Sequence, residues 1–171
     1  MKRARRSAAE LPQGTEPSSV TLLLVADPGG HLFELYGLRD VWSRFSRAWV
    51  TVRASDVETL LLGEHVLFAY GPTRRSLRNL LRNTFVAVRI VRRLRPAVVM
   101  TTGAALSVPF VWAGRLFGAR VVYIETSGRV GISMSCRLAA PVADRLYVQW
   151  PEVVPQVSKA RYAGTIFFSP R

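Results

Sequence analysis

Short apolar runs alternate with longer stretches of helical periodicity along this chain. The runs lie at residues 20–26, 49–53, 66–70, 97–101, 120–125, 145–149 and 161–168. The first of them, VTLLLVA, is continuously apolar, which is typical of a parallel strand buried on both faces. The pattern therefore predicts six strands and a seventh near the C-terminus.

The stretches between the runs predict helices, at residues 31–46, 76–94, 106–117 and 133–142, with one more that begins at Ser55. Glu58 follows Ser55 by three residues, which is a capping-box pattern. Strands that alternate with helices predict βαβ crossovers and hence an α/β fold, a Rossmann-like doubly wound parallel sheet. Ligands of such sheets bind at the carboxyl ends of the strands, so the loops that follow the strands are the candidate sites.

Length and composition indicate one domain. The chain has 171 residues, of which 49% are hydrophobic, enough for a single core. We assign residues 20–171 to this domain and residues 1–19, which are basic and poor in apolar residues, to a flexible tail. The single Cys136 cannot form an internal disulfide, and no Cys/His cluster has the spacing of a metal site. We therefore expect a buried thiol, a reducing cytoplasmic setting, and neither metal nor cofactor.

The longest uncharged run lies between Arg95 and Arg115 and is about as long as a transmembrane helix. Pro96, Gly103 and Pro109 interrupt it. We therefore expect a buried strand and a core helix here, and no membrane span.

The net charge of +13 predicts attraction to an anionic partner. Residues 73–95 hold eight arginines and no acid. On a helical wheel one face carries Arg78, Arg82, Arg89 and Arg93, and another, which we expect to pack on the sheet, carries Leu77, Leu80, Leu81, Thr84, Val88 and Val91. Arginine stripes are usually solvated, but the lack of compensating acids favours contact with anionic lipid head groups. No aromatic ladder accompanies the arginines, so we expect no nucleic acid partner.

The loop after the first run reads DPGGH at residues 27–31. Gly29 and Gly30 let the backbone approach a ligand closely, and the helix N-terminus that follows attracts an anion. His31 is a candidate general base toward a sugar hydroxyl; a tight turn with a histidine that only packs is the equal alternative. The full G-x-G-x-x-G pattern is absent, which argues against a nicotinamide site.

Two further loops carry polar side chains. Gly103 lies among small and hydroxyl residues that suit a diphosphate or a partner's backbone, although a turn alone would also need a glycine. Glu125 ends a predicted strand and could bind sugar hydroxyls, while Arg129 could meet a phosphate. A contact between Glu125 and Arg129 is the structural alternative.

The sixth strand is followed by Gln149, Trp150 and Glu152. A tryptophan beside these polar side chains suits sugar stacking or a protein interface, and otherwise covers the end of the core. We favour the interface.

Four segments, taken together, resemble one family. They read GGHLFEL (29–35), RLRPAVVMTTGAALSVPF (93–110), GARVVYIETSGRV (118–130) and DRLYVQWPEV (144–153), and they are similar to the PssD/asparagine-linked glycosylation protein 14 family. The resemblance covers residues 20–168. It implies the N-terminal, acceptor-side half of a B-fold glycosyltransferase (GT-B) that is divided between two chains. Bacterial members of this family serve exopolysaccharide or capsule assembly, and eukaryotic members serve dolichol-linked oligosaccharide synthesis.

The resemblance also implies an activity and a set of site residues. A sugar, N-acetylglucosamine or another hexose, would pass from a UDP-sugar to a polyprenyl-diphosphate-linked acceptor. His31 and Glu125 are then the candidate catalytic residues, and the acceptor or its phosphates would contact Gly29, Gly30, Gly103, Thr126, Ser127 and Arg129.

The expected partners are a separate donor-binding subunit, the lipid-linked acceptor and an anionic membrane surface. The subunit would meet Gln149, Trp150 and Glu152, and the membrane would meet Arg78, Arg82, Arg89 and Arg93. Eukaryotic members carry an N-terminal membrane helix where this sequence has a basic tail, so we expect a peripheral position on the cytoplasmic face. The alternative from another class is a non-catalytic scaffold that recruits and activates the donor-binding subunit.

Overall fold

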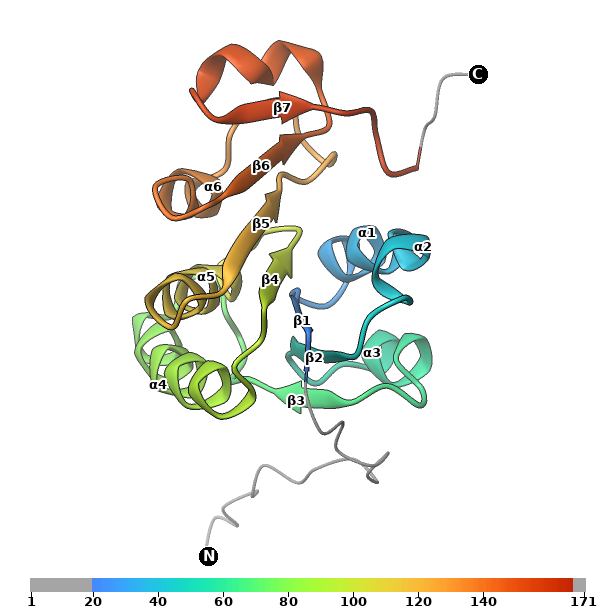
Figure 1. Ribbon diagram of the computed structural model, residues 1–171, viewed down its shortest axis with the longest axis vertical. Helices are drawn as coiled ribbons and strands as arrows, with labels where there is room; N and C mark the ends of the chain where they lie inside the picture. The colour runs from blue at the N-terminus through green and yellow to red at the C-terminus, as the bar shows by residue number, and fades with distance from the viewer. Residues whose placement is uncertain (1–19, 168–171) are drawn as a thin grey trace, which may run out of the picture.

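The computed structural model describes residues 20–167, which form an α/β domain around one parallel sheet. The sheet has seven strands in the order β3-β2-β1-β4-β5-β6-β7, and every neighbouring pair is parallel (Figure 1). The strands are β1 (Leu22–Val25), β2 (Arg47–Thr51), β3 (Val66–Phe68), β4 (Val98–Thr101), β5 (Arg120–Ile124), β6 (Arg145–Val148) and β7 (Ala160–Tyr162). The predicted fold class is therefore confirmed. The last strand, expected at residues 161–168, is shorter than predicted, since β7 ends at Tyr162. The proposed tail at residues 1–19 lies outside the described residues.

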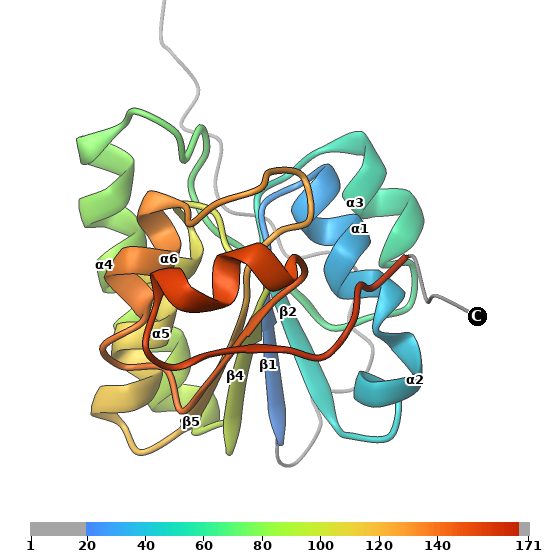
Figure 2. The ribbon, with the colours of Figure 1, turned by 90° about the horizontal axis from the view of Figure 1, so that it is seen from above.

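Two layers of helices cover the sheet (Figure 2). One layer consists of α1 (Gly30–Gly37), α2 (Arg39–Trp42) and α3 (Ser55–Leu60), and the other of α4 (Leu77–Leu94), α5 (Ser107–Leu116) and α6 (Met134–Ala139). A 3₁₀ helix, η1 (Pro151–Gln156), connects β6 to β7. None of the helices in the described part of the chain is both long and apolar enough to span a bilayer.

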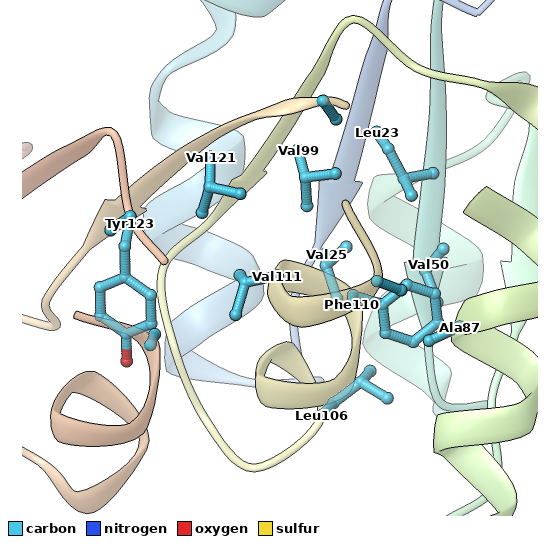
Figure 3. Packing of buried hydrophobic residues seen from close by; sticks show 14 of the residues in the cluster. Leu23, Val25, Val50, Ala87, Val99, Leu106, Phe110, Val111, Val121 and Tyr123 are labelled. Carbon is cyan, nitrogen blue, oxygen red and sulfur yellow. The ribbon is translucent and has the colours of Figure 1, made fainter. Parts of the chain in front are cut away.

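The central strand β1 is buried on both faces because its alternate side chains point to opposite helix layers. Leu23 and Val25 of β1 pack in the cluster that contains residues of α4, α5 and α6, whereas Leu22 and Leu24 pack in the cluster on the other face. Figure 3 shows Leu23, Val25, Val99 and Val121 of adjacent strands lying against α5. Cys136 is buried in the first cluster as a free thiol, as expected.

Two helix predictions on the α1–α3 layer are wrong in detail. The helix expected at residues 31–46 ends at Gly37 and begins again at Arg39, because Leu38 leaves helical geometry and its N–H bonds to Leu35 O. The Trp42 indole then donates to the same Leu35 carbonyl at 2.9 Å, which stabilises the break. The N-cap of α3 is Ala54 and not Ser55, and no side chain caps this helix, so the capping box does not form.

The predicted orientation of α4 is also wrong. Of the six residues expected to pack on the sheet, Val91 is buried, whereas Leu77 is 71%, Leu81 57% and Leu80 38% exposed, and Thr84 and Val88 are exposed too. The buried face instead carries Asn79, Asn83, Ala87 and Val91.

The two buried asparagines explain this rotation of α4. Asn83 accepts from Tyr70 N and donates to Tyr70 O, both at 2.9 Å, and Asn79 donates to Pro72 O at 2.9 Å. These amides satisfy backbone groups after β3 that no strand pairs, and an unpaired buried backbone group is costly. The rotation leaves an apolar stripe of α4 at the surface, made of Leu77, Leu80, Leu81, Phe85 and Val88.

Candidate active site

The strand order reverses direction at β1, which pairs with β2 on one side and β4 on the other. In open parallel sheets the crevice outside the carboxyl ends of two such strands is the usual ligand site. Here the loop after β1 leads into α1, and the loop after β4 leads into α5 on the opposite face. The loops at residues 26–31 and 102–106 therefore form the centre of the candidate site.

His31 lies at the start of α1 and is bonded to the neighbouring loop. Its Nδ1 is 2.9 Å from Thr102 O, and the Thr102 hydroxyl donates to His31 O at 2.6 Å. A carbonyl oxygen can only accept, so Nδ1 carries the hydrogen in this contact. In the neutral ring Nε2 then holds the lone pair. The structure thus gives His31 the tautomer that a general base requires.

The three glycines of the predicted site play two different roles. Gly29 has a φ of +85° and is the N-cap of α1, and no atom lies within 4 Å of a Cβ placed on Gly29 or Gly30. These two residues therefore leave open space beside the helix N-terminus. Gly103, in contrast, has a φ of +104° and is packed: a Cβ there would lie 2.8 Å from the Tyr123 hydroxyl and 3.6 Å from Cε1 of His31.

Asp27 lies in the same loop, between β1 and α1, and is 8% exposed. Its Oδ2 accepts from the Thr73 hydroxyl at 2.6 Å, whereas its buried Oδ1 has no hydrogen-bond partner within the described chain. Burial raises the pKa of Asp27, against the lowering by the Thr73 hydrogen bond and by His31 and Arg74. On the outer side of the loop, Gly29 N donates to Asp56 at 2.7 Å. The β1–α1 loop is thus bonded through Asp27 to the segment before α4 and through Gly29 to α3.

Glu125 follows β5 and is 2% exposed. Its Oε2 accepts from the Ser133 hydroxyl at 2.9 Å, and Ser133 also caps α6 by accepting from Cys136 N at 3.1 Å. Burial raises the pKa of Glu125, hydrogen bonds from Cys136 and Ser133 lower it, and His31 lowers it further through its charge. Glu125 is thus close enough to interact with His31, but its carboxylate is engaged within the protein. No ion pair joins Glu125 to Arg129 in the part of the chain that the structure describes.

Thr126, Ser127 and Arg129 lie in the loop between β5 and α6. Arg129 is exposed. Thr126 and Ser127 do not project freely: both donate to a carboxylate of α1, that of Glu34. The structure therefore brings this loop against the helix that carries His31.

Glu34 is the residue that the sequence analysis missed. It is 3% exposed, and its Oε1 accepts from Ser127 N at 2.8 Å, Ser127 Oγ at 2.6 Å and Thr126 Oγ1 at 3.1 Å. Its Oε2 is buried without a partner among the described residues. Residues three apart lie on one face of a helix, so the spacing between His31 and Glu34 was a signal available in the sequence.

The three residues predicted at a partner interface differ in exposure. Gln149 is buried; its amide donates to Glu125 O at 3.1 Å and accepts from Ile166 N at 2.9 Å, so it is occupied within this chain. Trp150 is 36% exposed, and its indole donates to Ser127 O at 2.9 Å. Glu152 is exposed on η1. The described residues contain no cluster of His, Cys, Asp and Glu that could hold a metal ion.

Comparison with known proteins decides the family. The family model described as "Oligosaccharide biosynthesis protein Alg14 like" matches residues 71–166. The UDP-N-acetylglucosamine transferase subunit ALG14 of Eremothecium gossypii is 30% identical over 177 residues, with 85% of this chain and 79% of the relative covered. The chain belongs to the Alg14-like family. The resemblance stated from the four sequence segments is thereby confirmed.

Members of a second group of transferases are similar to this Alg14-like chain over part of their length. The UDP-N-acetylglucosamine–N-acetylmuramyl-(pentapeptide) pyrophosphoryl-undecaprenol N-acetylglucosamine transferase of Ralstonia nicotianae is 30% identical over 166 residues, with 88% of this chain and 42% of the relative covered. The crystal structure of Acinetobacter baumannii MurG has the same fold, with a TM-score of 0.71, 20% identity, and 88% of this chain and 46% of that chain covered. The chain thus spans less than half the length of these two proteins.

Proposed function

We propose that this chain is the acceptor-side subunit of a two-chain glycosyltransferase that moves N-acetylglucosamine, or another hexose, from a UDP-sugar to a polyprenyl-diphosphate-linked acceptor. The family relative is named a subunit of a UDP-N-acetylglucosamine transferase. The Ralstonia transferase is named for an undecaprenol-linked pyrophosphoryl acceptor. The word subunit in the name of the family relative supports a second chain that takes part in the transfer.

The observation that carries the proposal is the hydrogen bond from His31 Nδ1 to Thr102 O. With the hydrogen on Nδ1, Nε2 of the neutral ring would be the proton acceptor of the proposed reaction. In the proposed reaction the acceptor hydroxyl attacks the anomeric carbon of the donor sugar, Nε2 takes the hydroxyl proton, and UDP leaves. Glu125 is engaged with Ser133, so we assign it to the support of the site and not to direct proton transfer.

The acceptor's diphosphate would lie at the open end of α1. Gly29 and Gly30 leave that space free, and a helix N-terminus stabilises negative charge. The exposed Arg129 would meet the same phosphates from the neighbouring loop. The donor-binding chain would close the crevice from the side of Trp150 and Glu152.

The lipid portion of the acceptor requires a membrane surface close to the crevice. The exposed apolar stripe of α4 supports a membrane contact at this place. Its most exposed members are Leu77, Leu81 and Phe85, and they lie in the first half of α4. This half follows β3 and therefore begins at the carboxyl edge of the sheet. Arg78 and Arg89 are exposed on the adjacent face, and Arg82 lies 5.4 Å from the centre of the Tyr70 ring. An apolar stripe flanked by arginines is typical of a peripheral contact with an anionic bilayer.

The test is transfer by the complex of this chain with its donor-binding chain. The substrates are radiolabelled UDP-N-acetylglucosamine and lipid acceptor extracted from the source membranes. His31→Asn keeps a side-chain N–H for Thr102 O but has no equivalent of Nε2, so kcat should fall about 10²- to 10⁴-fold while the complex still assembles. His65→Asn is the matched control, because His65 precedes β3 at the opposite edge of the sheet, and it should leave kcat unchanged.

The same experiment separates the catalytic role from the scaffold role. The donor-binding chain is assayed alone, with the parent chain, and with the His31→Asn variant. If it transfers slowly alone and both forms of this chain stimulate it equally, the subunit recruits its partner without supplying the base. Near-normal turnover by His31→Asn would therefore reject the proposed role of His31.

A further inference from the structure

Glu34 lies at the junction of three parts of the candidate site, although it is not among the residues expected from the sequence. It is on α1 together with His31, it contacts the β5–α6 loop, and through that loop it reaches the segment of Trp150. A carboxylate that is 3% exposed is unusual unless its charge is compensated by hydrogen bonds. Here one oxygen receives three, from the backbone N–H and the hydroxyl of Ser127 and from the hydroxyl of Thr126.

These hydrogen bonds fix a turn as well as two side chains. Thr126 Oγ1 also accepts from Gly128 N at 3.2 Å, so the turn that leads to Arg129 is closed by the residue that Glu34 holds. Ser127 is held from a second side, since its carbonyl accepts from the Trp150 indole at 2.9 Å. The backbone of Ser127 thus has its N–H bonded to α1 and its carbonyl bonded to the residue before η1.

Glu34 lies on the same helix, α1, as His31, the proposed base. His31 and Glu34 are three residues apart on one short helix, so their side chains extend from neighbouring positions on the same face. His31 is bonded to the β4–α5 loop and Glu34 to the β5–α6 loop. The first helix therefore sets the distance between the proposed base and the loop that carries Arg129.

We infer that Glu34 is a positioning residue for the acceptor: it holds the Thr126–Ser127 turn so that Arg129 and His31, the proposed base, contact the same bound acceptor. The inference rests on the proposed function. Glu34 itself is buried beneath the turn and does not touch substrate. Its loss should weaken acceptor binding and leave donor binding, which belongs to the other chain, unchanged.

The test uses the two-chain complex with Glu34→Gln, Ser127→Ala and the double variant. Glu34→Gln keeps an accepting oxygen but removes the charge that strengthens the three hydrogen bonds, so the KM for the lipid acceptor should rise about 10-fold with the KM for UDP-sugar unchanged. Because the Ser127 hydroxyl is one of the three donors to Glu34, the effect of the double variant should be smaller than the sum of the two single effects. Glu58→Gln, an exposed carboxylate on α3, is the matched control and should change neither KM.

If Glu34 only stabilises the fold, the transfer assay of Glu34→Gln gives a different result. Partial unfolding lowers the concentration of active complex and hence the apparent kcat, but it does not alter the acceptor KM. An unchanged acceptor KM in Glu34→Gln, an equal rise of both KM values, or additive effects in the double variant would overturn the inference.

A second measurement is independent of transfer. Hydrogen exchange of the Ser127 amide, which donates to Glu34, should be faster in Glu34→Gln than in the parent chain, and unchanged in Glu58→Gln. Equal exchange at Ser127 would overturn the inference even if the complex is active. If the parent complex transfers no sugar while Ser127 exchange responds as expected, the proposed function fails and the structural link between Glu34 and the turn stands.

Discussion

Replacement of Phe85 by serine is a direct test of the exposed stripe on α4. Phe85 is 77% exposed, more than any other aromatic side chain in the described part of the chain, and it lies between Leu81 and Val88 on one face of the helix. It makes no contribution to the buried core of the sheet, so its removal should not unfold the protein. What it should change is the affinity of the chain for a bilayer.

The magnitude follows from the area that a membrane would cover. Burying a Phe or Leu side chain completely contributes about 1.5–3 kcal/mol. Scaled by the 77% exposure of Phe85, the loss is about 1.2–2.3 kcal/mol, or roughly 7- to 50-fold in the partition coefficient. With Leu77 at 71% and Leu81 at 57% exposure, serine at all three positions should remove about 3–6 kcal/mol.

The assay is sedimentation of the chain with vesicles of phosphatidylcholine and phosphatidylglycerol. Leu62→Ser is the control, because Leu62 is 87% exposed but follows α3 in the layer on the other face of the sheet. It should bind as the parent does. The Phe85 deficit should persist at high salt, whereas the contribution of Arg78 and Arg89 should be screened. Equal binding by Phe85→Ser and the parent, or equal losses at Phe85 and Leu62, would refute the assignment of this surface.

Two further predictions concern stability. Gly103→Ala should lower the free energy of unfolding by about 1–3 kcal/mol and Tm by about 2–12 °C, because its Cβ meets the Tyr123 hydroxyl in a backbone conformation of positive φ. Gly118→Ala, with a φ of +85° and no neighbouring atom within 4 Å, should lose less; equal losses by calorimetry would contradict the close contact. Glu125→Gln should alter the pH dependence of stability. Burial raises the pKa of Glu125 above 4.5, so the folded parent binds more protons than the unfolded chain between 4.5 and the raised pKa. The parent therefore gains stability as the pH falls through this window. The Tm advantage of Glu125→Gln over the parent should therefore be largest at neutral pH and shrink on acidification, and a constant difference would contradict the sign.

Much of the architecture could be predicted from local pattern. Strands that are buried on both faces are mostly apolar, and LLLV of β1 and VVMT of β4 fit that pattern without reference to the rest of the chain. Ser76 and Ser133 cap α4 and α6 by accepting from the N–H three residues on, which is equally local. The position of His31 followed from the same logic, since a loop between a buried strand and a helix lies at the carboxyl edge of a parallel sheet.

The face of α4 could not be predicted in this way. The wheel placed the leucines inward because burial of apolar area usually determines which face of a helix packs. In the folded chain, the unpaired backbone groups of Tyr70 and Pro72 needed partners, and Asn79 and Asn83 supply them. That requirement arises only once β3 and α4 are adjacent, so it is invisible in a helical wheel.

In the candidate site, too, the residue types can be read from the sequence, whereas the contacts of the buried side chains depend on the tertiary structure. The sequence by itself determined which residue types stand at the strand ends, among them Gly29, His31, Glu125 and Arg129. Only the tertiary structure decided that Glu125 turns inward to Ser133, and that Glu34, an acid on an amphipathic helix, is buried under Ser127. The physical reason is that a carboxylate is buried only where several donors converge on it, and here the donors come from a loop more than 90 positions away in the chain.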